Sequence, residues 1–108
     1  MKKYIAVLHF DGLYTYEQVH EMTKETPQCV YYDRKYKYGN GDMVEHKREN
    51  KQELETIQSR CVTETYWGKI AAVGDTEEEA LLRVHRVYAN HLTGLLKKEE
   101  EKMNALKK

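Results

Sequence analysis

The chain has 108 residues, with 18 basic and 18 acidic side chains and a formal net charge of zero. This length fits one domain that can bury a core without disulfides or structural metals. The charge balance argues against a strongly basic protein that binds nucleic acid mainly through phosphate attraction, although it is compatible with a local basic patch.

The N-terminal segments predict a strand followed by a helix. Tyr4 to Phe10 is a nearly continuous apolar run ended by an Asp-Gly turn, which predicts a buried strand. From Thr15 to about Glu25, apolar residues recur every three positions after a capping-box pattern, which predicts a short amphipathic helix ended by Pro27. A strand, a helix and a further strand in this order suggest a crossover connection.

The middle of the chain predicts a hairpin. Cys29 to Tyr38 forms a long strand, Gly39 to Asp42 is the clearest turn in the chain, and Met43 to Lys47 returns as the hairpin partner. For Asn50 to Arg60 we favour a helix, because Asn50 can cap it and good helix formers follow. A further strand is the alternative for this segment.

The last third of the chain predicts a central strand and a long helix. Tyr66 to Val73 is apolar on both faces, as in a strand covered on both sides. Thr76 and Glu79 fit a capping box at the start of a helix. The apolar stripe of this helix is about twice as wide as packing on one sheet requires, so the helix should also pack on something else. We expect it to continue past Gly94.

These elements together predict an α+β fold. The expected architecture is a mostly antiparallel sheet of three to four strands packed by two to three helices, the longest of which is C-terminal. We expect residues 1–96 to form a single α+β domain and residues 97–108 to form a charged helical extension.

Neither catalysis nor metal binding has a supporting pattern. The five histidines show no ligand spacing, and the nearest pair, His85 and His91, lies six positions apart. A phosphate-binding glycine loop, a nucleophile elbow and an HExxH motif do not occur. Cys29 and Cys61 stand far apart, which favours reduced thiols in a cytoplasmic compartment. We therefore expect no enzyme, no metal site and no cofactor.

The outer edge of the long helix is the first candidate functional surface. Its residues from Leu82 onward alternate in spacings of three and four, as in a coiled coil, with Glu99 and His85 as the polar exceptions. The alternative is a helix that only packs on the sheet and ends in a solvated tail. We expect self-association, or docking of a partner helix, through Leu82, His85, Ala89, Leu92, Leu96, Met103 and Leu106.

The tyrosine-rich hairpin strand is the second candidate surface, because it interleaves rings with cations. Such a surface can stack the bases of single-stranded nucleic acid and hold its phosphates. It is equally suited to a protein interface, and cross-strand tyrosine pairs can also serve the sheet alone. The residues concerned are Tyr32, Arg34, Tyr36, Tyr38, Lys35 and Lys37.

One segment carries a family resemblance. The run AVGDTEEEALLRV is similar to the strand-turn-helix of HicB-like antitoxins, in which a GDTxEEA segment enters a helix after a strand. The other strand motif of that family, with its proline-containing turn, has no counterpart here, so the resemblance implies no function for this chain. As a whole, the short chain, rich in Lys, Glu and Tyr, resembles small accessory proteins encoded by phages of Gram-positive bacteria.

The function expected from the sequence is a non-enzymatic protein-binding or structural accessory module that self-associates. A small nucleic-acid-binding regulator that uses the hairpin is the alternative. The apolar run near the N-terminus is too short for a signal peptide or a membrane span. We therefore expect no membrane partner and a cytoplasmic location, in the host cytoplasm or the virion if the protein is encoded by a phage.

Overall fold

The computed structural model describes residues 2–11, 14–62 and 65–107, with side chains outside 59–67. The elements, in chain order, are β1 (Tyr4–Asp11), β2 (Tyr14–Glu25), β3 (Cys29–Tyr38), β4 (Gly41–Asn50), the short 3-10 helix η1 (Lys51–Glu53), β5 (Gln58–Val62), β6 (Thr65–Gly74) and α1 (Glu77–Leu106). The six strands form one sheet in the order β4-β3-β2-β1-β6-β5. Every neighbouring pair is antiparallel.

The α+β class agrees with the sequence, but the predicted number of elements is wrong. We expected three to four strands and two to three helices, whereas the described ranges contain six strands, one long α-helix and a single 3-10 turn. Two segments predicted as helices account for most of this difference.

The first wrong prediction is the helix from Thr15 to Glu25, which is strand β2. A spacing of three residues places Tyr16 and Val19 on opposite faces of a strand. Val19 packs against the core on the helix side, and Met22 packs against a second core on the other side. Because Val19 and Met22 contact different cores on opposite faces of β2, a helix-like spacing is compatible with a strand. The connection from β1 is an antiparallel hairpin, so the predicted crossover is wrong as well.

The second wrong prediction is the helix from Asn50 to Arg60. Asn50 does act as a cap, since its side chain accepts a hydrogen bond from the backbone N–H of Gln52 at 3.0 Å. The helical turn nevertheless ends at Glu53, and Glu55 adopts a left-handed backbone conformation with φ of 58°. The N–H of Glu55 donates to the carbonyl of Ala71 at 2.8 Å. Pairing with β6 therefore overrides the local helix propensity.

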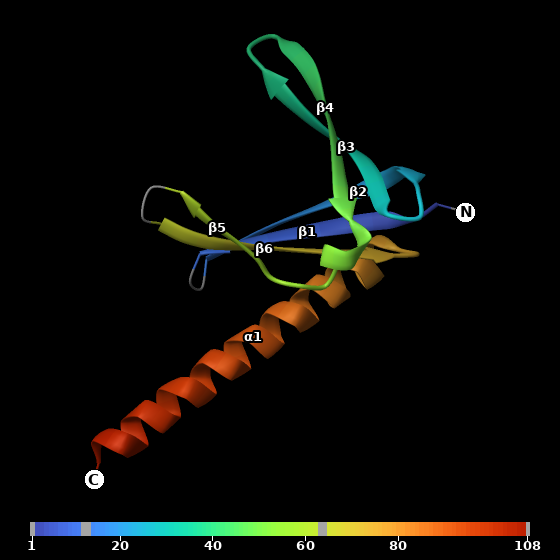
Figure 1. The fold of residues 1–108 in the computed structure, drawn as a ribbon. Helices are drawn as coiled ribbons and strands as arrows, with labels where there is room; N and C mark the ends of the chain where they lie inside the picture. Colours follow the sequence, from blue (N-terminus) through green and yellow to red (C-terminus); the bar gives the residue numbers. More distant parts are fainter. Residues whose placement is uncertain (1, 12–13, 63–64, 108) are drawn as a thin grey trace.

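Strand β2 is bent, and the bend separates the sheet into two parts. Tyr14 to Glu21 pairs with β1, whereas Met22 to Glu25 pairs with β3, and the register shifts between Met22 and Lys24. A bulge of this kind bends a strand and increases its local twist. The β3–β4 hairpin consequently leaves the plane of the other strands and rises on the face opposite α1 (Figure 1).

Two small cores lie on the two faces of strands β1 and β6. The core under α1 consists of Ala6, Leu8, Ile70, Ala72, Ala80, Val84 and Tyr88. The core under the root of the hairpin consists of Ile5, Val7, Val30, Tyr32 and Ala71. Because residues of β1 and β6 alternate between the two cores, the prediction that the strand from Tyr66 to Val73 is central is confirmed.

The turn from β6 into α1 follows the predicted capping box. Thr76 is the N-cap, and its hydroxyl accepts a hydrogen bond from the N–H of Glu79 at 3.0 Å. The carboxylate of Glu79 accepts from the N–H of Asp75 at 3.1 Å. Gly74 permits this close packing, because a Cβ there would lie 2.6 Å from the backbone nitrogen of Ala80.

The molecule is elongated because α1 extends past the sheet. Its radius of gyration is 16.8 Å and its longest dimension is 59 Å, whereas a compact domain of this length has a radius of about 13 Å. Figure 1 shows α1 crossing beneath the sheet at an angle and moving away from it toward the C-terminus. The helix is continuous through Gly94, as predicted, and it does not break between the expected domain and its extension.

Candidate functional site

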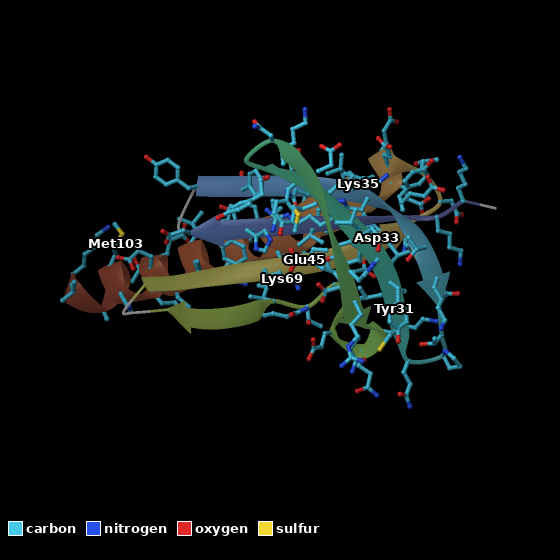
Figure 2. The ribbon with its side chains drawn as sticks, turned by 90° about the horizontal axis from the view of Figure 1, so that it is seen from above. Tyr31, Asp33, Lys35, Glu45, Lys69 and Met103 are labelled. Carbon is cyan, nitrogen blue, oxygen red and sulfur yellow. The ribbon has the colours of Figure 1, made fainter. Side chains whose placement is uncertain are left out.

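The first candidate site is the overhang, which we define as Thr93–Leu106 of α1. Leu92 is the last helical residue that is partly buried against the core, and every residue of the overhang is exposed. At 1.5 Å per residue, this stretch is about 21 Å long. It carries Leu95, Leu96, Met103 and Leu106, with Leu96 62% and Leu106 85% exposed. Met103 lies beyond the ends of the strands in Figure 2.

The predicted interface residues divide between the folded unit and the overhang. Leu82 and Ala89 are exposed on the outer side of the packed half of α1, and Leu92 contacts the core. His85 is ion-paired with Glu17 of β2, so one of the two polar positions in the heptad pattern already has a partner within the chain. The remaining residues of the pattern lie on the overhang.

The second candidate site is a cleft of about 490 Å³ between the hairpin and the sheet. The root of the hairpin packs closely, because Val30 and Tyr32 join the core above Ile5 and Val7. Farther along, the hairpin diverges from the sheet and leaves the cleft open. Lining residues are Val7, His9, Phe10, Asp11, Tyr14, Thr15, Tyr16, Gln18, Tyr32, Arg34, Lys47 and Lys69.

The floor of the cleft is a row of three residues on adjacent strands. His9 of β1 is the direct cross-strand partner of Tyr16 on β2 and of Lys69 on β6. The rings of His9 and Tyr16 are stacked with centroids 6.5 Å apart. The Tyr16 hydroxyl accepts a hydrogen bond from Gln18 Nε2 at 2.7 Å. The floor therefore offers an aromatic surface next to a cation.

The roof of the cleft is the inner face of the hairpin. Tyr32 is paired with Lys47 and Arg34 with Glu45, so a ring and two cations face the floor. The carboxylate of Glu45 lies 3.6 Å from Arg34 and 3.7 Å from Lys47. One half-exposed carboxylate is thus shared by two cations.

A buried network closes the inner end of the cleft. Glu49 is only 4% exposed, and its carboxylate is ion-paired with Lys69. The Tyr32 hydroxyl donates to Glu49 Oε1 at 3.4 Å. Burial and the neighbouring Glu49 carboxylate raise the pKa of Tyr32, because both oppose formation of a phenolate. Lys69 neutralises the Glu49 carboxylate, so Arg34 and Lys47 share only Glu45 and these five side chains keep one excess positive charge. Asp11 adds one carboxylate elsewhere in the lining.

The two histidines beside the cleft experience this positive charge. Burial lowers the pKa of His9, and Lys69, Lys47 and Arg34 lower it further. Burial also lowers the pKa of His20, with additional effects of Arg34 and Lys47. His20 stacks on Tyr32 with ring centroids 5.1 Å apart. Burial and the nearby cations thus both disfavour the protonated form of these two imidazoles.

The structure separates the predicted hairpin residues by their position. Tyr32 is a buried core residue, whereas Arg34 lines the cleft and lies 5.5 Å from the centroid of the Tyr36 ring. Lys35 and Lys37 alternate with these residues and therefore belong to the outer face of the hairpin. Tyr38 is 77% exposed at the hairpin tip. The six residues thus do not form one common surface.

The cleft brings in residues that sequence reasoning did not group together. His9, Tyr16, Lys47 and Lys69 come from four strands, and no motif connects them. Their juxtaposition depends on the sheet register and on the bend in β2 that places the hairpin over β1 and β6. Figure 2 shows the hairpin crossing above these strands, with Glu45 and Lys69 labelled near the crossing.

Within the described ranges, no group of three or more His, Cys, Asp or Glu side chains is arranged to hold a metal ion. None of the helices described combines the length and the apolar character that crossing a bilayer requires. Comparison of the chain with protein-family models, with curated proteins and with solved structures finds no significant match.

Proposed function

We propose that the protein is a non-enzymatic protein-binding module that self-associates through the overhang of α1, with the same helix of a second copy as its partner. The observation that carries this proposal is the apolar seam of the overhang. It continues the heptad spacing of the packed half of the helix, and no described residue of the chain covers it. The seam residues in the overhang are Leu96, Met103 and Leu106, with Glu99 as the polar exception.

The overhang gains little from the rest of its own chain. Most helical stability in proteins comes from packing of an apolar face, and short isolated helices are marginal in water. The overhang has good helix formers but no tertiary contact that covers its apolar side chains. A partner helix would bury Leu96 and Met103 at positions where a coiled coil places its core.

A second copy is the partner that the charge distribution favours. The net charge of the chain is zero, so two copies do not repel each other strongly at neutral pH. Glu99 occupies a core position of the heptad pattern, and a parallel in-register pair would set two Glu99 carboxylates against each other. An antiparallel pair that sets Leu96 opposite Glu99 of the second copy avoids this repulsion.

Sedimentation of the pure protein at micromolar concentration tests the proposal. We expect a concentration-dependent dimer that is lost in a Leu96→Glu/Met103→Glu variant. An Asn90→Glu/Asn104→Glu variant is the matched control, because it adds the same two charges to the same helix at exposed positions about 100–120° around the helix from Leu96 and Met103. A strict monomer, unchanged when residues 97–108 are deleted, contradicts self-association, and equal loss in both variants contradicts the assigned seam.

Cysteine cross-linking tests the orientation. In a Cys29→Ser/Cys61→Ser background, one protein carries Leu96→Cys and another carries Glu99→Cys. An antiparallel pair forms the disulfide chiefly when the two proteins are mixed, because position 96 of one copy faces position 99 of the other. Efficient disulfide formation within each protein alone contradicts the antiparallel arrangement.

A further inference from the structure

The cleft between the hairpin and the sheet has three properties of a ligand site. It is concave, with a volume of about 490 Å³, within the size range of pockets that bind small molecules. Half of its lining residues are aromatic or apolar, and Arg34, Lys47 and Lys69 add three cations. It also joins residues from β1, β2, β3, β4 and β6, so a rigid sheet supports most of its wall.

We propose that this cleft binds a nucleotide, with the base against the rings of Tyr16 and His9 and the phosphate on Arg34 and Lys47. The nucleotide is either a free mononucleotide or one residue of a single strand, because both sources present the same planar base and phosphate. This site is separate from the overhang and does not depend on self-association.

The aromatic half of the site is the floor. Tyr16 is 59% exposed and lies beside His9, so part of its ring remains accessible to a ligand. Tyr14 extends the aromatic lining around the same floor. Stacking on aromatic side chains tolerates any base, because every base has a flat π surface.

The phosphate half of the site is the roof. Arg34 and Lys47 project from neighbouring strands and compete for a single carboxylate, Glu45, which is itself half exposed. A phosphate can therefore approach these cations without displacing a buried ion pair. The buried pair of Lys69 and Glu49 remains intact behind them. Burial is the main reason for the lowered pKa values of His9 and His20, and the cations Arg34 and Lys47 lower both values further.

The exposed tip of the hairpin provides a path away from the cleft. Tyr36 and Met43 are cross-strand partners beyond Arg34 and Glu45, and both are exposed on the side that continues the roof. A nucleic-acid strand entering the cleft could place its next base on Tyr36, which a free mononucleotide cannot do. The dependence of affinity on the length of the nucleic-acid ligand therefore distinguishes the two sources.

Calorimetric titration tests the proposal with adenosine monophosphate, ribose 5-phosphate, inorganic phosphate and an eight-residue oligothymidylate. We expect adenosine monophosphate to bind at least about tenfold more tightly than ribose 5-phosphate, because the sugar phosphate lacks the stacking base. Equal affinity of these two ligands overturns the base site, and undetectable binding of every ligand at low salt overturns the whole proposal. If the affinity for oligothymidylate exceeds that for adenosine monophosphate about tenfold or more, the ligand is a residue of a nucleic-acid strand. If the affinity for oligothymidylate is comparable or lower, the ligand is the free nucleotide.

Charge-neutralising variants locate the phosphate. Arg34→Gln/Lys47→Gln should weaken adenosine monophosphate binding at least about tenfold, since charge-assisted hydrogen bonds are lost. Lys35→Gln/Lys37→Gln removes the same charge from the outer face of the same hairpin and should change the affinity less than about twofold. Equal weakening by the two pairs overturns the location. Tyr16→Ala, at an exposed position, provides a variant that leaves the core intact and should also weaken binding.

Discussion

The two halves of α1 carry similar apolar spacing in very different surroundings. In the first half, Ala80, Val84 and Tyr88 are buried against β1 and β6. In the overhang, Leu96 and Met103 continue the outer line of Leu82 and Ala89 and are exposed. Hydrophobic spacing therefore indicates which face of a helix requires cover, but it does not indicate whether the same chain provides that cover. The difference between the halves can be tested by substitutions that act on one half alone.

The largest effect is expected at the interface between the packed half and the sheet. A Cβ on Gly68 would overlap the ring of Phe10, and Phe10 in turn contacts Tyr88 and His91 of α1 with ring centroids 5.1 Å and 5.4 Å away. Gly68→Ala should lower the free energy of unfolding by about 3 kcal/mol, because the ring must move out of a closely packed position. Urea unfolding measures this change. Gly41→Ala, where only a backbone oxygen at 3.9 Å is near, is the control.

A paired truncation compares the two halves directly. Val84→Ala removes a fully buried side chain and should lower the free energy of unfolding by about 2 kcal/mol at any protein concentration. Leu96→Ala should change the unfolding free energy of the monomer by less than about 0.5 kcal/mol, because the side chain is already exposed. The same substitution should weaken self-association. A comparable loss of monomer stability from both variants contradicts the distinction between the halves.

Much of the fold follows from sequence where local and tertiary signals agree. The capping box at Thr76 and the glycine-rich turn between β3 and β4 use short-range chemistry, and the structure has both features. The prediction for the segment after Thr15 is wrong because Val19 and Met22 of β2 pack against cores on opposite faces of the sheet, so the apolar residues do not alternate as in a strand with one buried face. The prediction of a helix after Asn50 is wrong because pairing with β6 outweighs the helix propensity of four residues.

The two candidate sites also differ in whether they can be predicted from the sequence. The seam on the helix can be predicted from the sequence, because residues three and four positions apart lie on the same face of a helix. The cleft is not visible, since His9 and Lys69 become neighbours only through the register of β1 with β6. Arg34 and Lys47 reach them only because the bulge in β2 turns the hairpin over the sheet. A prediction of this site requires strand order and the position of the bulge, which depend on tertiary packing.

A stabilising substitution is expected in the overhang. Gly94 lies in the interior of α1, and a Cβ at this position would have no neighbouring atom within 4 Å. Gly94→Ala should increase stability by up to about 1 kcal/mol, because alanine has the higher helix propensity. Thermal unfolding monitored by circular dichroism measures the change. A destabilised variant would show that another element or another copy packs closely against this glycine.

The smallest effect concerns the pH dependence of stability around the cleft. The folded-state pKa values of His9 and His20 lie below the ordinary value of 6.5, chiefly because both rings are partly buried. Between the lowered values and 6.5 the unfolded chain binds more protons than the folded chain, so the free energy of unfolding decreases as the pH falls below about 6.5. The charged groups that affect His9 are Lys69, Lys47, Arg34 and Glu49, and those that affect His20 are Arg34 and Lys47.

Urea unfolding at pH 7.5 and at lower pH values measures this dependence. The decrease should be smaller in a His9→Gln/His20→Gln variant, which lacks both titrating groups. His46 is exposed on the outer part of the hairpin and pairs with Asp33 at 2.6 Å, so His46→Gln provides a control away from the cleft. If the double variant keeps the full pH dependence, groups elsewhere in the molecule cause it. A bound anionic ligand should oppose the decrease, since it stabilises the protonated form of His9 at the floor of the cleft.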